Sequence, residues 1–127
     1  MGKSLKLKGT EDTPEVNLDQ EANQFVISGR SLPEDAVEFY RPVISWVKAY
    51  VQSPNPDTEF QIKLQYFNSS SVKQVSDLLV TLEGIVKAGK KVKVTWLYEE
   101  GDELMEIKGQ EFKSVLGIPF ELKTYAP

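Results

Sequence analysis

Four short polar residues in a row, Asn68, Ser69, Ser70 and Ser71, form the segment of this sequence with the clearest chemical potential. Each serine carries a hydroxyl that can accept a phosphoryl group, and Asn and Ser are also the side chains that cap helix N-termini. A helix N-terminus stabilises added negative charge, because its first N–H groups are free and its dipole is positive there. The segment therefore predicts either a plain helix cap or a cap that also presents a phosphate acceptor.

Neither His nor Cys occurs among the 127 residues. The chain therefore lacks the side chains for Ser-His-Asp or Cys-His nucleophiles, for zinc ligation by imidazole or thiolate, and for disulfides. Carboxylates, lysines, tyrosines and hydroxyls remain, and the spacing of the acids indicates no pair set up for general acid–base catalysis. We predict that the protein is not an enzyme and that it uses no metal and no cofactor.

Two charged clusters are weaker candidates for chemistry. Four acids at residues 99–103 surround one turn and could bind a hard cation, but acids are also favoured where a helix begins. Four lysines between residues 87 and 93 lie at an expected helix end and in the strand after it, where cations suit the helix dipole. We interpret both clusters as solvated surface charge.

Composition limits the class of protein further. With 15 Lys and Arg against 19 Asp and Glu the formal net charge is −4, which argues against a general nucleic-acid binder. No apolar run is long enough to span a membrane, and the first eight residues alternate Lys with Leu and do not predict a signal peptide. We expect a single cytoplasmic domain over residues 1–127, with no nucleic-acid or membrane partner.

Hydrophobic periodicity predicts the elements that position the serine segment. Period-two strands are expected at six places, near residues 5–7, 16–18, 25–27, 58–67, 91–98 and 120–122. A first helix is expected after a capping box formed by Ser31 and Glu34. A second helix follows the serines and ends at Gly89, and a third is capped by Asp102 and ends at Gly117.

The resulting order, β-β-β-α-β-α-β-α-β, predicts an α/β fold whose mixed sheet has a parallel core. Because the strands at 58–67 and 91–98 alternate apolar and polar residues, we expect helices mainly on one face of the sheet. The serine segment then lies at the C-terminal end of a central strand, where open α/β sheets commonly present their functional groups.

Four stretches of the sequence together resemble the SiaC-type regulatory phosphoproteins: residues 13–16 (TPEV), 29–34 (GRSLPE), 40–46 (YRPVISW) and 66–71 (YFNSSS). The similarity extends over nearly the whole chain. The resemblance implies a fold related in shape to the STAS, or anti-sigma-factor-antagonist, domain. It also implies a bacterial partner-switching role, in which phosphorylation of this protein controls whether it binds an output partner.

The resemblance further implies three kinds of partner. These are a serine/threonine kinase of the histidine-kinase-like type, a PP2C-like phosphatase and an output signalling protein, for which a nucleotide cyclase is one candidate. The family's phosphate acceptor is the hydroxyl residue directly after the Asn of the strand-to-helix loop, commonly Thr, and that position is Ser69 here. Ser70 and Ser71 stay open as alternatives, because three serines in succession leave the register ambiguous.

Asn68 is expected to cap the helix, and Lys73, one turn beyond Ser69, to lie where its ammonium group could steady a phosphate. A different class of function is also compatible with the sequence. A STAS-like domain could instead bind a small ligand, on the polar face of its sheet or at its loop ends.

Overall fold

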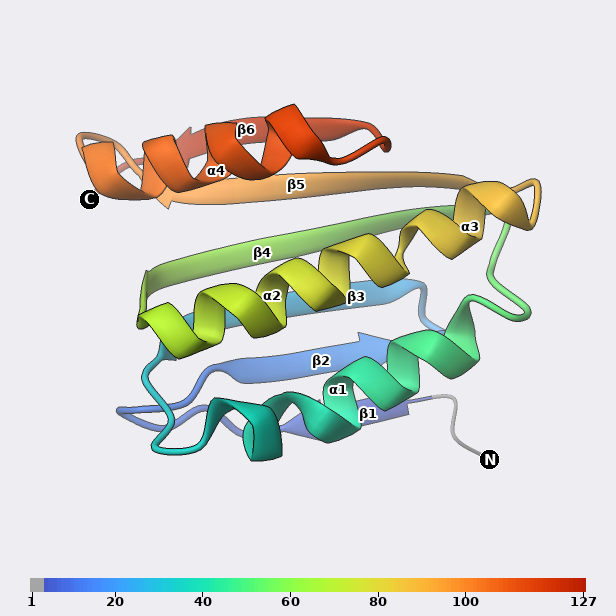
Figure 1. Ribbon diagram of the computed structural model, residues 1–127, viewed down its shortest axis with the longest axis horizontal. Helices are drawn as coiled ribbons and strands as arrows, with labels where there is room; N and C mark the ends of the chain where they lie inside the picture. The colour runs from blue at the N-terminus through green and yellow to red at the C-terminus, as the bar shows by residue number, and fades with distance from the viewer. Residues whose placement is uncertain (1–3) are drawn as a thin grey trace.

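The computed structural model describes residues 4–127; residues 1–3, where the N-terminal segment discussed above begins, lie outside the described part. One sheet contains six strands, and their spatial order follows the chain order (Figure 1). They are β1 (Ser4–Leu7), β2 (Glu15–Asp19), β3 (Gln24–Ser31), β4 (Asp57–Phe67), β5 (Lys91–Glu99) and β6 (Phe120–Tyr125). The first three strands pair antiparallel, and β3 to β6 pair parallel. The predicted α/β fold with a parallel core is confirmed.

The helices are α1 (Ala36–Tyr50), α2 (Ser69–Thr81), α3 (Glu83–Lys87) and α4 (Glu103–Val115). Figure 1 shows all of them on the same side of the sheet, as the strand patterns predicted. In β4, for example, Phe60, Ile62 and Leu64 are buried beneath the helices, while Glu59 and Lys63 alternate with them and are exposed. None of the helices within residues 4–127 combines the length and the apolar character needed to cross a bilayer.

Trp96 on β5 is the centre of the C-terminal half of the core. Its side chain is fully buried, and its ring centroid lies 5.9 Å from that of Phe67, 5.4 Å from Phe112 and 6.2 Å from Phe120. The indole N–H donates to the carbonyl oxygen of Met105 at 2.9 Å, so the polar end of this large side chain is satisfied inside the core. This contact fixes α4 against β5.

The capping box predicted at Ser31 is wrong. Ser31 still belongs to β3, where it pairs with Phe67 of β4, and its side chain is completely buried. The helix begins four residues later than expected, and Asp35 is its N-cap, with Oδ1 accepting from the backbone N–H of Glu38 at 3.0 Å. The sheet pairing holds Ser31 extended, so the cap falls on the next suitable side chain.

The predicted second helix is divided in two at Leu82. Just before the break, the Thr81 hydroxyl donates to the carbonyl oxygen of Asp77 at 2.8 Å. A hydroxyl that binds the carbonyl four residues back competes with the helical hydrogen bond and bends the helix. The predicted end of the helical segment is confirmed, since Gly89 follows α3 in a left-handed conformation, φ 80°, that favours glycine.

Candidate functional site

The serine segment lies where β4 ends and α2 begins. Asn68 has extended backbone angles, and its Oδ1 accepts from the backbone N–H of Ser71 at 3.0 Å, which confirms the predicted N-cap. The backbone N–H of Asn68 donates to the carbonyl oxygen of Ser31 at 3.0 Å, so the turn is also tied to the end of β3. Both bonds fix the first turn of α2 against the sheet.

The three serines of this turn have different surroundings. Ser71 is completely buried. Ser70 is exposed, and its hydroxyl donates to Oδ1 of Asn68 at 3.2 Å. Ser69 is the first residue of α2 and is exposed, and within residues 4–127 its hydroxyl makes no hydrogen bond. Ser69 is therefore the serine whose oxygen is free and open to solvent.

A buried chain of hydroxyl groups lies beneath the turn. Ser71 Oγ donates to the carbonyl oxygen of Ser31 at 3.2 Å, Ser31 Oγ donates to Ser71 Oγ at 2.9 Å, and Tyr40 OH lies 2.7 Å from Ser31 Oγ. With the Ser31 proton already used, the phenol of Tyr40 is the donor in the last pair. These hydrogen bonds connect β3, α1 and the first turn of α2.

Burial raises the pKa of Tyr40 to about 12, although its hydrogen bond with Ser31 acts in the opposite direction. The phenol therefore keeps its proton and its donor role at neutral pH. No sequence pattern predicted this network, because Tyr40 fits the apolar stripe of α1 and Ser31 fits a capping pattern. Only the fold brings the two side chains to Ser71.

Tyr40→Phe tests this network through its pH dependence. Below pH 10.0, the ordinary pKa, the phenol is protonated in the folded and unfolded states alike. Between pH 10.0 and about 12 the phenol ionises in the unfolded state but not in the folded state. The contribution of Tyr40 to the free energy of unfolding therefore falls as the pH rises, by about 3 kcal/mol in total. Urea denaturation should find the variant less stable at about pH 8, by ~1 kcal/mol for the lost hydrogen bond. The gap should close between about pH 10.5 and 11, where the wild type has lost about 1 kcal/mol, and should reverse at higher pH. A constant gap would contradict the burial of an intact phenol.

Asn68→Ala tests the cap. The N–H of Ser71 loses its side-chain acceptor, which should lower the free energy of unfolding by about 1 kcal/mol. Asn68→Asp is the matched control, because it keeps the oxygen and adds a charge that the helix dipole favours. Thermal and urea denaturation of both variants check this, and equal losses in the two would show that the cap oxygen is unimportant.

The electrostatic surroundings of Ser69 favour an added negative charge. The first turn of α2 contains no acidic side chain, whereas the other helices have Glu38, Glu83 or Glu103 there. Lys73 is exposed one turn beyond Ser69, and no carboxylate of residues 4–127 lies within 4.0 Å of its ammonium group. Neighbours four residues apart face each other on a helix, so Lys73 can reach a group on Ser69.

The acidic turn at residues 99–103 has the structural role expected of it. Asp102 caps α4, its Oδ1 accepting from the backbone N–H of Met105 at 3.1 Å. Within the described part of the chain, no three acidic side chains converge closely enough to hold a metal ion. Glu103, in the first turn of α4, also suits the positive end of that helix.

Fold and turn together define an α/β domain with helices on one face and an exposed serine at the start of the helix that follows a central strand. The family model described as SiaC family regulatory phosphoprotein matches residues 7–125. The chain belongs to that family, as the sequence motifs indicated.

Relatives and solved structures agree with this assignment. An uncharacterized protein of Pseudomonas aeruginosa strain UCBPP-PA14 is 30% identical over 121 residues, which cover 95% of this chain and 96% of that protein. The structure of SiaC of Pseudomonas aeruginosa is similar with a TM-score of 0.85 and 29% identity, covering 96% of this chain and 98% of that one. A second similar structure, of diguanylate cyclase SiaD in complex with its activator SiaC from Pseudomonas aeruginosa, gives a TM-score of 0.88 and 30% identity, covering 95% and 99%.

Proposed function

We propose that this protein is a phosphorylation-controlled switch that binds a nucleotide cyclase through the surface around α2 when Ser69 is unmodified. The observation that carries the proposal is the position of Ser69, whose exposed hydroxyl at the N-terminus of α2 makes no hydrogen bond within residues 4–127. The family's description as regulatory phosphoproteins supports a modified hydroxyl. The similar structure in which SiaC is the activator of a diguanylate cyclase supports a cyclase as the partner.

The surroundings of the other two serines support Ser69 as the acceptor. Phosphorylation of Ser71 needs access to an oxygen that is completely buried and bonded to Ser31. Phosphorylation of Ser70 displaces its bond to Asn68, the residue that caps the helix. At Ser69 neither cost arises. A phosphate there adds about −1.5 to −2 charges next to the free N–H groups of α2, which the fold tolerates.

In this mechanism the protein supplies no catalytic group. A cytoplasmic kinase of the histidine-kinase-like type transfers the γ-phosphoryl group of ATP to Ser69 Oγ, and the serine proton is released. A PP2C-like phosphatase hydrolyses the ester with water and restores the hydroxyl. Lys73 offers the phosphate an ammonium group one turn away. The protein is a substrate of both enzymes and carries the signal to its partner by binding.

Incubation with its serine/threonine kinase and ATP, followed by phosphopeptide mapping, tests the acceptor. We expect one phosphate on the wild type, located at Ser69, and none on Ser69→Ala. Ser70→Ala is the matched control, because it removes a neighbouring exposed hydroxyl and should be labelled like the wild type. Equal labelling of Ser69→Ala and the wild type would refute the assignment.

A further inference from the structure

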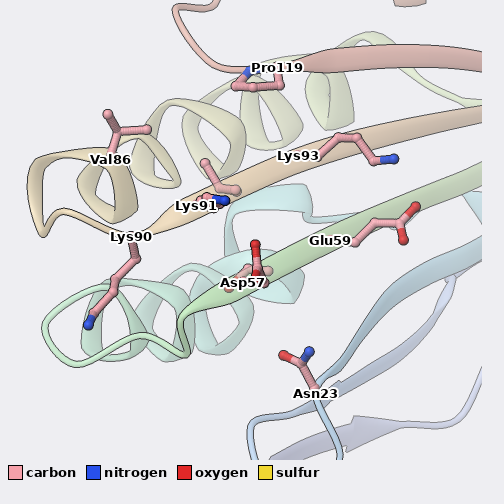
Figure 2. Close-up of a pocket in the computed structure, with 10 residues that line it drawn as sticks. Asn23, Asp57, Glu59, Val86, Lys90, Lys91, Lys93 and Pro119 are labelled. Carbon is pink, nitrogen blue, oxygen red and sulfur yellow. The ribbon is translucent and has the colours of Figure 1, made fainter.

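A pocket lies at the end of the parallel strands opposite to the serine turn (Figure 2). It is formed where β4 and β5 begin, next to the end of α3, and has a volume of about 710 Å³. Sites for small organic ligands commonly measure roughly 300–1,000 Å³. β4 separates Asp57, at one side of the pocket, from Asn68 by about 35 Å. The pocket is therefore a second feature, independent of Ser69.

Apolar side chains form part of the pocket lining. Val92 is buried within the sheet, while Val86 at the end of the helical segment is about half exposed, 49%, and Pro119 lines the pocket just before β6. Figure 2 shows Val86 and Pro119 on different segments around the same space. Val86 is among the large apolar side chains that the folded core leaves exposed. An apolar group in the pocket would remove this surface from water.

The charged residues of the pocket fall into two groups. Lys93 and Glu59 already have partners, since Lys93 Nζ lies 3.3 Å from Glu121 Oε1 and Thr95 Oγ1 donates to Glu59 Oε2 at 2.6 Å. Figure 2 shows both side chains extending along the strands, away from Val86.

The second group is Lys90, Lys91 and Asp57, for which no ion pair within 4.0 Å is found in residues 4–127. The backbone that carries the lysines is fixed. The N–H of Lys90 donates to Ile85 and that of Lys91 to Pro56, both at 3.0 Å. Two lysines against one aspartate give this group a local charge of +1 in a chain whose net charge is −4.

We propose that this pocket binds a small organic anion with an apolar ring. The ring packs against Val86, Val92 and Pro119, and the anionic group is held by the ammonium groups of Lys90 and Lys91. Figure 2 shows the exposed Lys90 side chain pointing away from Val86, so it turns toward the ligand on binding. Asp57 then accepts a hydrogen bond from a hydroxyl or amino group of the ligand. Phosphate and carboxylate share this chemistry, because both present oxygens to a lysine point charge. The sequence analysis interpreted these lysines as solvated surface charge. In this proposal they bind the anionic group of a ligand whose ring packs on the neighbouring apolar residues.

Amide NMR titration tests the proposal with four probes: phenyl phosphate, benzoate, inorganic phosphate and benzyl alcohol. We expect saturable shifts at residues 57–59 and 86–93 with at least one of the two ring anions. That anion should bind at least about tenfold more tightly than inorganic phosphate or benzyl alcohol, because inorganic phosphate has no ring and benzyl alcohol has no anionic group. A preference for phenyl phosphate identifies phosphate as the anion, and a preference for benzoate identifies a carboxylate. No saturable shift with either, or shifts centred elsewhere, would overturn the proposal.

Two variants test separately whether the lysines bind the anionic group and whether Val86 contacts the ring. Lys90→Glu/Lys91→Glu should weaken the ring anion about tenfold or more, while the control Lys48→Glu/Lys123→Glu makes the same change in net charge on other exposed lysines and should retain affinity. Val86→Ser should weaken the ring anion and leave inorganic phosphate unchanged. Retained dispersion of the amide spectrum shows that each variant is folded. Equal losses in the two lysine variants would attribute the binding to net charge and overturn the site.

Discussion

Phosphorylated protein should bind the proposed cyclase partner about a hundredfold more weakly than unmodified protein does. The phosphate places about two negative charges at the start of α2, in the surface that we propose as the contact with the partner. Leaving a charge desolvated and unpaired in an interface costs roughly 2–5 kcal/mol, and each ~1.4 kcal/mol corresponds to a tenfold change in affinity. Isothermal titration of the purified cyclase with both forms measures the effect.

Two variants make this comparison specific. Ser69→Ala should bind like the unmodified protein and should stay bound after treatment with kinase and ATP. Ser70→Asp tests whether any negative charge on this exposed turn is sufficient, because it places a single carboxylate one residue along, and it should weaken binding less than phosphate at Ser69 does. Tighter binding of the phosphorylated form would reverse the proposed direction of the switch.

Gly109→Ala should destabilise the protein, although alanine is the better helix former by about 1 kcal/mol. Gly109 lies on the buried side of α4, where an added Cβ would be 2.6 Å from Trp96 Cδ1 and 2.9 Å from Leu122 Cδ2. Trp96 cannot give way easily, because it is enclosed and bonded to Met105. Overpacking of this kind costs about 1–3 kcal/mol and occasionally more. We expect it to exceed the gain of ~1 kcal/mol in helix propensity, because the added Cβ would meet Trp96 at less than 3.0 Å.

Urea denaturation gives the size of this effect, and we expect a clear fall in the midpoint with little change in slope. Gln110→Ala is the matched control, since Gln110 is the exposed neighbour on the same helix and its replacement should change stability by less than about 0.5 kcal/mol. A Gly109→Ala variant as stable as the wild type would show that α4 does not approach Trp96 as closely as described.

Periodicity predicted the architecture because β2, β3 and β4 each have one buried face. The alternation of Phe60, Ile62 and Leu64 with polar residues is what a sheet covered on one side requires, and β4 has that pattern in the structure. Asn68 was predictable as a cap for a similar reason, because the cap is a local interaction between residues three apart. Features that depend on residues close together in the sequence could thus be predicted from it.

Features that depend on tertiary contacts were not predictable in this way. The pairing of Ser31 with Phe67 keeps Ser31 in the sheet, and no local pattern distinguishes this from a helix cap. Its bonds to Tyr40 and Ser71 join residues 9 and 40 positions apart. The pocket likewise combines Asp57, Val86 and Pro119 from distant segments. The lysine cluster could be identified in the sequence, but the apolar residues that line the pocket with it come together only in the fold.

The central claim is that Ser69 carries a reversible phosphate in the cell. Intact-mass measurement of the protein isolated from its native cells, followed by fragmentation to locate any modification, tests it most directly. We predict a population heavier by the mass of one phosphate, with the phosphate on Ser69, and loss of that population after treatment with a PP2C-like phosphatase. A phosphate located on another residue, or protein that stays unmodified even when its phosphatase is absent, would contradict the account.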